Sequence, residues 1–155
     1  MFFDELLSLL TPLDGVRQDP KYHPEGDALF HSLQVFDCAR RDTTDPILLG
    51  AALLHDVGKV LGSSDHDATG ADLLDGLVHP RVVFLVRHHL DLLRAPGKAR
   101  RRHTGRDLAD LTMLRRWDLA GRAPNAHAST PEDAVTFLLE QGGEAALSHD
   151  HAEDL

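Results

Sequence analysis

The 155-residue sequence contains one cysteine, Cys38. A single thiol excludes an internal disulfide bond and a metal site built from several thiolates. Any metal ion that this chain holds must therefore be bound through nitrogen and oxygen atoms, which histidine, aspartate and glutamate supply.

Long apolar runs are also missing, since no stretch approaches the roughly 18 consecutive apolar residues of a membrane-spanning helix. The first residues, Met1 to Glu5, lack the basic start and apolar core of a secretory signal. We therefore expect a cytoplasmic protein without a membrane partner.

Basic residues are in the minority, with 16 against 25 acidic residues and a formal net charge of -9. This balance disfavours stable binding to nucleic acid or anionic membranes. A basic segment nevertheless runs from 94 to 122. Guanidinium groups match phosphate oxygens in forked pairs, so a loop over a pocket could present four arginines to a phosphorylated substrate: Arg100, Arg101, Arg102 and Arg106. A solvated surface is the simpler alternative.

Length and hydrophobic pattern indicate one helical domain over 1–155. Apolar residues recur at helical spacing, whereas strand alternation is hard to find. We expect an all-α protein, a compact bundle of about seven helices, followed by a frayed tail at 142–155. The helices are expected at 2–10, 27–41, 47–55, 66–77, 81–93, 105–121 and 131–141, with caps at Asp27, Asp45, Thr104 and Thr130. Residues 11–26 and 96–103 are expected as irregular segments.

Eleven histidines are the clearest excess, and histidine is the commonest metal ligand. In the helix expected at 47–55, His55 continues the apolar face, and Asp56 follows it directly. In the helix expected at 105–121, Asp118 shares a face with leucines. A buried carboxylate is costly unless it is paired or binds a metal, and an ion pair with Arg115 is the alternative explanation.

The ordered set of His31, His55-Asp56, His66, His88-His89 and Asp118 resembles the HD-domain metal-dependent phosphohydrolases. Residues 53–59, Leu-Leu-His-Asp-Val-Gly-Lys, match the most specific motif of that family. Residues 23–27, His-Pro-Glu-Gly-Asp, followed by His31, are similar to the HD domain of bacterial CCA-adding tRNA nucleotidyltransferases. The resemblance covers about 22–122, which we expect to be the domain core.

The resemblance implies that His31, His55, Asp56 and Asp118 bind a divalent metal ion. In two-metal members Asp56 would bridge, with His66 and one histidine of the His88-His89 pair holding the second ion. His89 is the preferred ligand of this pair, and His88 would then support the ligands from outside. Such donors suit one or two ions of Mn, Fe, Co, Ni or Zn, with Mg also possible.

The implied activity is hydrolysis of a small, nucleotide-like phosphate ester, by a phosphomonoesterase or phosphodiesterase. A bound metal ion acidifies water and neutralises charge on the phosphoryl oxygens. Asp56 and Lys59 are the expected catalytic residues. Lys59 would hold a phosphate or steady the leaving group, or else cap the preceding helix, where the macrodipole favours a cation.

Two other functions stay open. A mixed-valent di-iron oxygenase, similar to myo-inositol oxygenase, would use the same ligands and consume dioxygen. A non-catalytic signalling module would bind metal without turnover. The other histidines at 79, 103, 127, 149 and 151 follow no pattern and are expected on the surface, while His23 and Glu25 could border the pocket.

Overall fold

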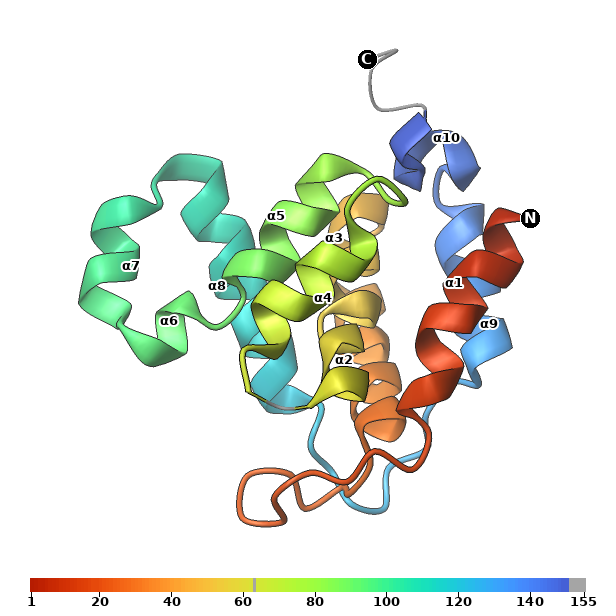
Figure 1. Cartoon of the computed structure of the whole chain (residues 1–155), viewed down its shortest axis with the longest axis horizontal. Helices are drawn as coiled ribbons and strands as arrows, with labels where there is room; N and C mark the ends of the chain where they lie inside the picture. The colour runs from red at the N-terminus through yellow and green to blue at the C-terminus, as the bar shows by residue number, and fades with distance from the viewer. Residues whose placement is uncertain (63, 151–155) are drawn as a thin grey trace.

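The computed structural model describes residues 1–62 and 64–150 (Figure 1). Within these residues the chain forms ten α-helices, two 3-10 helices and two isolated β-bridges, so the all-α prediction is confirmed. The α-helices are α1 (Phe2–Leu10), α2 (Ala28–Asp42), α3 (Pro46–Leu54), α4 (His66–Leu74), α5 (Pro80–His88), α6 (Asp91–Arg94), α7 (Pro96–Arg102), α8 (Gly105–Ala120), α9 (Pro131–Glu140) and α10 (Gly143–Leu147). The 3-10 helices are η1 (Thr11–Leu13) and η2 (Val57–Leu61).

Helix α3 is the centre of the bundle, and α2, α5, α8 and α9 pack against it. Its side chains are buried around most of the helix, as expected for a helix that is apolar on all sides. Helices α1 and α9 lie side by side on one flank, and α6 and α7 project at the opposite one (Figure 1). Among the described residues no single helix has the length and apolar character to cross a membrane. Only the bent pair Pro46–Leu61 and His66–Leu74 has that length and apolar character when the two segments are taken together.

Three of the four predicted caps are present. The side chains of Asp27, Asp45 and Thr130 accept hydrogen bonds from backbone N–H groups of the helices that they precede, at 2.7, 2.9 and 3.1 Å. Thr104 precedes α8 but its side chain makes no cap hydrogen bond, so that prediction is wrong. Gly105 has a φ of +57°, which breaks the regular first turn that such a bond requires.

The helix predicted at 81–93 is interrupted after His88 and resumes at Asp91. The ring of His89 lies at the break, where its Nδ1 donates to the carbonyl oxygen of Val86 at 2.6 Å. This imidazole takes the acceptor that the backbone N–H of Leu90 would use in a continuous helix.

The predicted basic loop at 96–103 is helix α7 over Pro96–Arg102, so that prediction is wrong. Proline at the first helical position is a favoured start, and arginine is a good helix former. The frayed tail is also wrong for 143–148: α10 forms, Leu147 is buried, and Ser148 bridges to Val78. Residues 151–155 lie outside the described residues.

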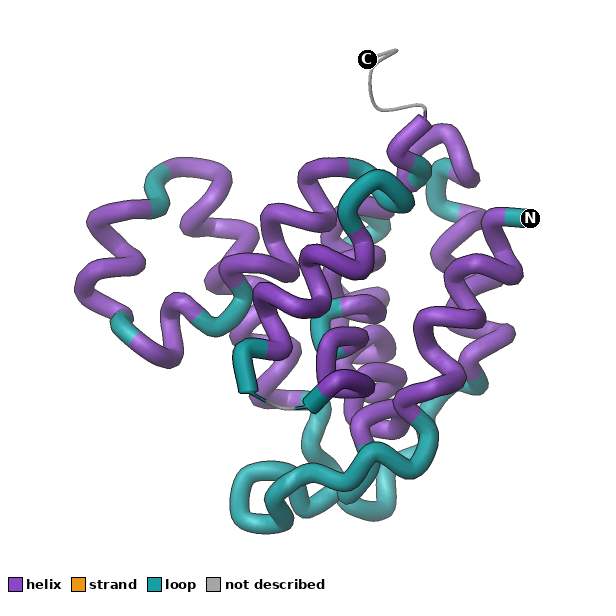
Figure 2. Tube along the Cα trace, viewed as in Figure 1, coloured by secondary structure: helices purple, strands orange, loops and turns teal. Residues whose placement is uncertain are grey.

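The predicted irregular segment between α1 and α2 begins with η1 and then runs across one end of the bundle. The loop after α8 lies at the same end (Figure 2). The guanidinium of Arg122 ties the two together by donating from Nη1 to the carbonyl oxygen of Tyr22 at 2.9 Å. Both segments therefore cover the end where α2, α3 and α8 bring the predicted site residues.

Candidate metal centre

Six of the seven predicted metal ligands converge inside the bundle from five parts of the chain. They form two groups of three whose ligand atoms lie within 4.8 Å of one another. Every one is buried, with relative exposure between 0% and 8%. The first group is His31, His55 and Asp118 and the second is Asp56, His66 and His89. Together they are called the histidine–aspartate centre, or HD centre, below.

The carboxylate of Asp56 lies between the two groups. Its Oδ2 is 3.2 Å from His55 Nε2 and 3.6 Å from His31 Nε2. Its Oδ1 is 3.1 Å from His66 Nε2 and 3.6 Å from His89 Nε2. Each oxygen thus faces a different pair of imidazoles, which is the arrangement of a carboxylate that can bridge two ions.

Asp118 contacts both the histidines of the centre and Arg115, the two alternatives that the sequence left open. Its Oδ1 is 2.8 Å from His31 Nε2 and 3.5 Å from His55 Nε2. Its Oδ2 accepts a hydrogen bond from Arg115 Nη1 at 3.2 Å. The arginine therefore occupies one oxygen and leaves the other facing the histidines.

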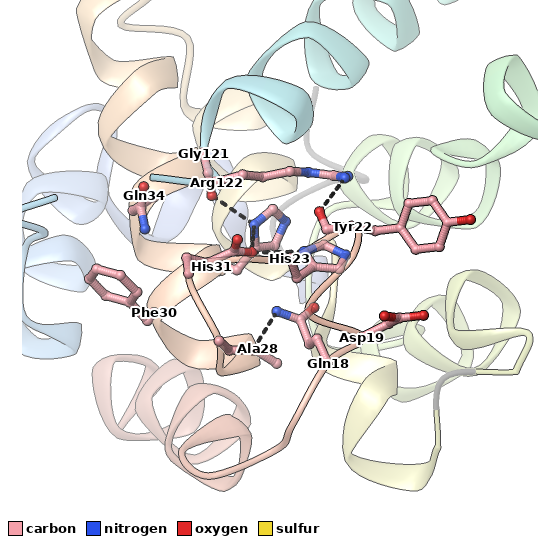
Figure 3. Close-up of polar contacts among 12 residues, drawn as sticks. Gln18, Asp19, Tyr22, His23, Ala28, Phe30, His31, Gln34, Gly121 and Arg122 are labelled. Atoms are coloured by element: carbon pink, nitrogen blue, oxygen red, sulfur yellow. Dashed lines mark hydrogen bonds and ion pairs between the residues drawn. The ribbon is translucent and has the colours of Figure 1, made fainter. Parts of the chain in front are cut away.

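Backbone carbonyls orient three of the imidazoles. His31 Nδ1 donates to the carbonyl oxygen of Gly121 at 2.8 Å (Figure 3). In the same way His55 Nδ1 donates to Ala52 at 2.8 Å, and His89 Nδ1 donates to Val86 at 2.6 Å. The opposite nitrogen, Nε2, then faces inward with its lone pair available to a metal. Three buried atoms at this point have no hydrogen-bond partner in the described part of the chain: His55 Nε2, His89 Nε2 and Asp56 Oδ2. Buried nitrogen and oxygen atoms that lack a hydrogen-bond partner fit the ligands of a bound cation.

Two glycines permit the close backbone contacts on which the centre depends. A Cβ on Gly58 would lie 2.1 Å from the carbonyl oxygen of His66, because η2 packs directly on the start of α4. A Cβ on Gly121 would lie 2.8 Å from the backbone nitrogen of Val35. Only glycine therefore allows α4 to approach Asp56 and the end of α8 to approach His31.

Charges in the centre shift the acid–base properties of its members. Burial alone lowers the pKa of His55 and raises the pKa of Asp56, since it penalises both charges. The attraction between opposite charges in the centre outweighs burial, so the pKa of His55 rises to about 10 and the pKa of Asp56 falls well below its usual value. Likewise, against burial, a hydrogen bond with His31 lowers the pKa of Asp118. The centre thus attracts positive charge, as protons or as metal ions.

A family model described as HD domain matches residues 29–137, a span that includes all six members of the centre. The chain belongs to the HD domain family. The resemblance inferred from the motif at 53–59 is confirmed, and the remaining members of the centre lie in the same matched region.

The HD domain is also similar to proteins named multifunctional CCA protein. It is 36% identical over 133 residues to that of Methylococcus capsulatus, covering 81% of this chain and 27% of the relative. It is 39% identical over 117 residues to the protein of Thioalkalivibrio sulfidiphilus, covering 72% of this chain and 25% of the relative. It is 34% identical over 123 residues to the protein of Halorhodospira halophila, covering 66% of this chain and 30% of the relative. The chain thus spans between 25% and 30% of the length of these relatives.

Glu25 supports the HD centre from behind His31. Its side chain is fully buried, and Oε1 lies 3.1 Å from His31 Nδ1 and 2.7 Å from His23 Nδ1. The rings of His23 and His31 are in edge contact, with centroids 4.8 Å apart (Figure 3). His23 lines the cavity above the centre, as expected, whereas Glu25 acts on a ligand rather than on the open space.

Lys59 brings a cation to the edge of the centre. Its Nζ lies 3.0 Å from Asp56 Oδ2 and donates a hydrogen bond to Gln18 Oε1. The side chain lines the cavity, so its ammonium faces both the carboxylate and the space where a substrate would enter.

A cavity of about 770 Å³ opens over the HD centre. Asp56, Lys59 and His66 belong to its lining, together with Asp118. Four arginines add positive charge: Arg17, Arg94, Arg115 and Arg122. Four residues add apolar surface: Val16, Tyr22, Leu90 and Leu93. The volume falls within the range of roughly 300 to 1,000 Å³ of small-molecule sites.

The four arginines predicted to bind substrate do not line this cavity. Arg100, Arg101 and Arg102 are exposed on α7, and Arg106 lies 3.6 Å from Asp110 in the first turns of α8. Helix α7 contributes no residue to the lining of this cavity. The cavity takes three arginines from other parts of the basic segment, Arg94, Arg115 and Arg122, and a fourth, Arg17, from the loop before α2. Arg17 carried no sequence signal that separated it from surface arginines.

His88, the seventh predicted ligand, lies apart from the HD centre. Consecutive helix residues point roughly 100° apart, so His88 and His89 face different sides of the end of α5. His88 Nδ1 is 2.8 Å from Asp91 Oδ2, and His103 Nε2 is 2.9 Å from the same oxygen. His103, expected on the surface, is buried.

Proposed function

We propose that this HD domain is a metal-dependent phosphohydrolase that hydrolyses a small, nucleotide-like phosphate ester. The observation that carries the proposal is Asp56, whose two carboxylate oxygens face different imidazole pairs at the floor of a cation-lined cavity. Membership of the HD domain family supports the reaction class.

The proposed ligands of one ion are His31, His55, Asp56 and Asp118, and those of a second are Asp56, His66 and His89. The donor set suits Mn, Fe, Co, Ni or Zn, with Mg possible. When bound, such ions supply a water acidic enough to attack phosphorus near neutral pH and neutralise charge on the phosphoryl group.

The residues of the chain supply binding and orientation. Lys59, at the edge of the centre, donates hydrogen bonds to a phosphoryl or leaving-group oxygen. Arg115 and Arg122 flank Asp118, with Arg122 Nη2 3.5 Å from Asp118 Oδ1, and add positive charge beside the same oxygens. The apolar surface of Tyr22, Leu90 and Leu93 suits the organic part of the ester. This combination favours a nucleotide over an inorganic phosphate.

Similarity to proteins named multifunctional CCA protein also supports a nucleotide-like substrate. For this reason the end of a nucleic acid is included among the substrates to be tested. The net charge of -9 predicts no stable nucleic-acid binding. The assay therefore includes short oligonucleotides beside phosphomonoesters and cyclic phosphodiesters.

The test is turnover by metal-free protein reloaded with Mn, Co, Ni or Mg. We expect metal-dependent release of phosphate or opening of a diester, lost with chelator and in Asp118→Asn, and retained in His127→Gln, whose side chain is exposed. No turnover on the whole panel by fully loaded protein would contradict the hydrolase.

A di-iron oxygenase is the second candidate, since two three-residue groups sharing contact with one carboxylate suit two irons equally well. Substrate-dependent oxygen uptake by the iron-loaded form, without turnover of phosphate esters, would favour it. Metal binding without either reaction would favour the non-catalytic signalling module.

A further inference from the structure

A second set of metal-binding side chains lies outside the HD centre, where α5, α6 and α7 meet. His88 at the end of α5, Asp91 at the start of α6 and His103 after α7 place their ligand atoms within 4.8 Å of one another. We call these three residues the His88 cluster. It shares no residue with the centre.

We propose that the His88 cluster is a separate binding site for a divalent transition ion such as Zn²⁺. Two imidazole nitrogens converge on Asp91 Oδ2, His88 Nδ1 at 2.8 Å and His103 Nε2 at 2.9 Å. Two nitrogens and one carboxylate oxygen are the donors of a three-ligand site that keeps a further position for water.

Neighbouring rings hold the two imidazoles in this orientation. The ring centroid of Phe84 lies 4.7 Å from that of His88 and 5.8 Å from that of His103. The two imidazole centroids are 4.9 Å apart. An ion would therefore meet donors that are already positioned, which reduces the entropy lost on binding.

Charge and access also suit a cation. Among the described residues, the ion-pair contacts of Asp91 are with the two histidines, because the nearby Arg94 turns its Nη1 to Asp67 Oδ2 at 2.7 Å. The side chains of His88 and Asp91 are 14% and 23% exposed, whereas that of His103 is 5% exposed. One side of the cluster is thus open to an arriving ion and a water ligand, and the other is closed by protein.

A bound ion would join the ends of α5 and α7 to the start of α6. This junction carries Leu90, Leu93 and Arg94, which line the cavity. The ion would therefore hold one wall of the cavity in place without taking part in the chemistry at Asp56.

The first experiment counts Zn²⁺ bound per chain by equilibrium dialysis of metal-free protein. We expect His103→Gln to bind one ion fewer than the unsubstituted protein, and His127→Gln, an exposed histidine outside both sites, to bind the same number. Asp91→Asn has nearly the same size and should also lose one ion, so it decides the outcome if His103→Gln does not fold by circular dichroism. Equal Zn²⁺ content in the folded variants and the unsubstituted protein would overturn the proposal and leave a hydrogen-bonded triad.

The second experiment separates this site from the HD centre. In Asp56→Ala, Zn²⁺ should still slow amide hydrogen exchange across 91–103, and this protection should vanish when His103→Gln is added. If Asp56→Ala folds but Zn²⁺ gives no protection there, the proposal is wrong. If only one ion binds the unsubstituted protein, and Asp56→Ala retains it while His103→Gln loses it, the His88 cluster stands and the proposed centre fails.

Discussion

Lys59 and Asp56 lie one 3-10 turn apart, and their contact sets what each can do. The ammonium is largely buried and contacts a carboxylate, so it is held at the edge of the cavity. An exposed lysine such as Lys98, on α7, has neither constraint. The role of Lys59 can therefore be separated from metal binding.

Lys59→Gln should lower kcat for a phosphate ester about 100-fold, the typical cost of removing one donor that stabilises a developing oxyanion. Metal content should be unchanged, because Lys59 is not a ligand, and Lys98→Gln should behave like the unsubstituted protein. Steady-state kinetics with metal analysis on the same samples checks this. A kcat within twofold of the unsubstituted value would assign Lys59 a structural role.

The pH dependence of stability should differ between metal-free and metal-loaded protein. Because the folded state raises the pKa of His55 from 6.5 to about 10, its contribution is full below pH 6.5 and is lost as the pH rises through about 10. The lowered pKa values of Asp56 and Asp118 act oppositely: their contribution is present above pH 3.8 and is lost as the pH falls below it.

We therefore expect the free energy of unfolding of the metal-free protein, measured with urea, to decline between about pH 7 and pH 10. The metal-loaded protein should lack most of this decline, since a ligand nitrogen of His55 holds the ion and not a proton. Parallel curves for the two forms would show that the imidazole does not exchange a proton for metal.

At the scale of secondary-structure elements, the contact between η2 and α4 sets the spacing of Asp56 and His66 within the second ligand group. The backbone of Gly58 touches that of His66, so Asp56 and His66 are held at a spacing that a side chain at 58 would change. Gly97, on α7, is the matched control, because a Cβ there would meet only the side chain of Arg101 at 3.6 Å.

Gly58→Ala should lower the free energy of unfolding by about 3 kcal/mol, the upper part of the range for overpacking, because the clash is with backbone. It should also weaken metal binding. Gly97→Ala should be neutral or slightly stabilising, as alanine is the better helix former. Urea unfolding of both variants checks this, and equal stability of the two would mean that η2 and α4 can separate at no cost.

Element boundaries were predictable where a local signal decides them. Asp27 and Asp45 form their caps because the bond is made within the same turn. The end of α5 was missed because an imidazole of His89 replaces a backbone donor, which no periodicity reveals. Helix α7 was missed because its arginines were interpreted only as a charged segment and not as helix-forming residues. Pro96, a residue favoured at the first position of a helix, did indicate where the helix begins.

At the scale of the whole molecule, the order of ligands along the chain allowed the six members of the centre to be proposed together. Contacts between distant segments could not be predicted in this way. Arg122 reaches Tyr22 only because the loop before α2 and the end of α8 share one end of the bundle. Three of the four cavity arginines lie in the basic segment at 94–122, but which of its arginines reach the cavity, and the addition of Arg17, follow from the packing and not from the sequence.

The distribution of charge leads to a prediction for substrate binding. Arg17 lines the cavity, whereas Arg100, Arg101 and Arg102 lie outside it. Arg17→Gln should raise KM about tenfold, the cost of one hydrogen bond to a charged group, at low and at high salt. Replacing the three α7 arginines with glutamine should raise KM only at low salt, where long-range attraction is not screened. The reverse pattern would place the substrate on α7.

The most direct test of the proposed centre is the metal content of Asp56→Ala. Measured in the His103→Gln background, so that only the centre is counted, the substitution should remove most of the bound metal with helicity by circular dichroism unchanged. Asp72→Ala, an exposed aspartate in a surface ion pair with Arg87, is the control and should leave the content intact. The two oxygens of Asp56 face both ligand groups, so a loss confined to Asp56→Ala is the predicted result. Undiminished metal in folded Asp56→Ala would contradict it.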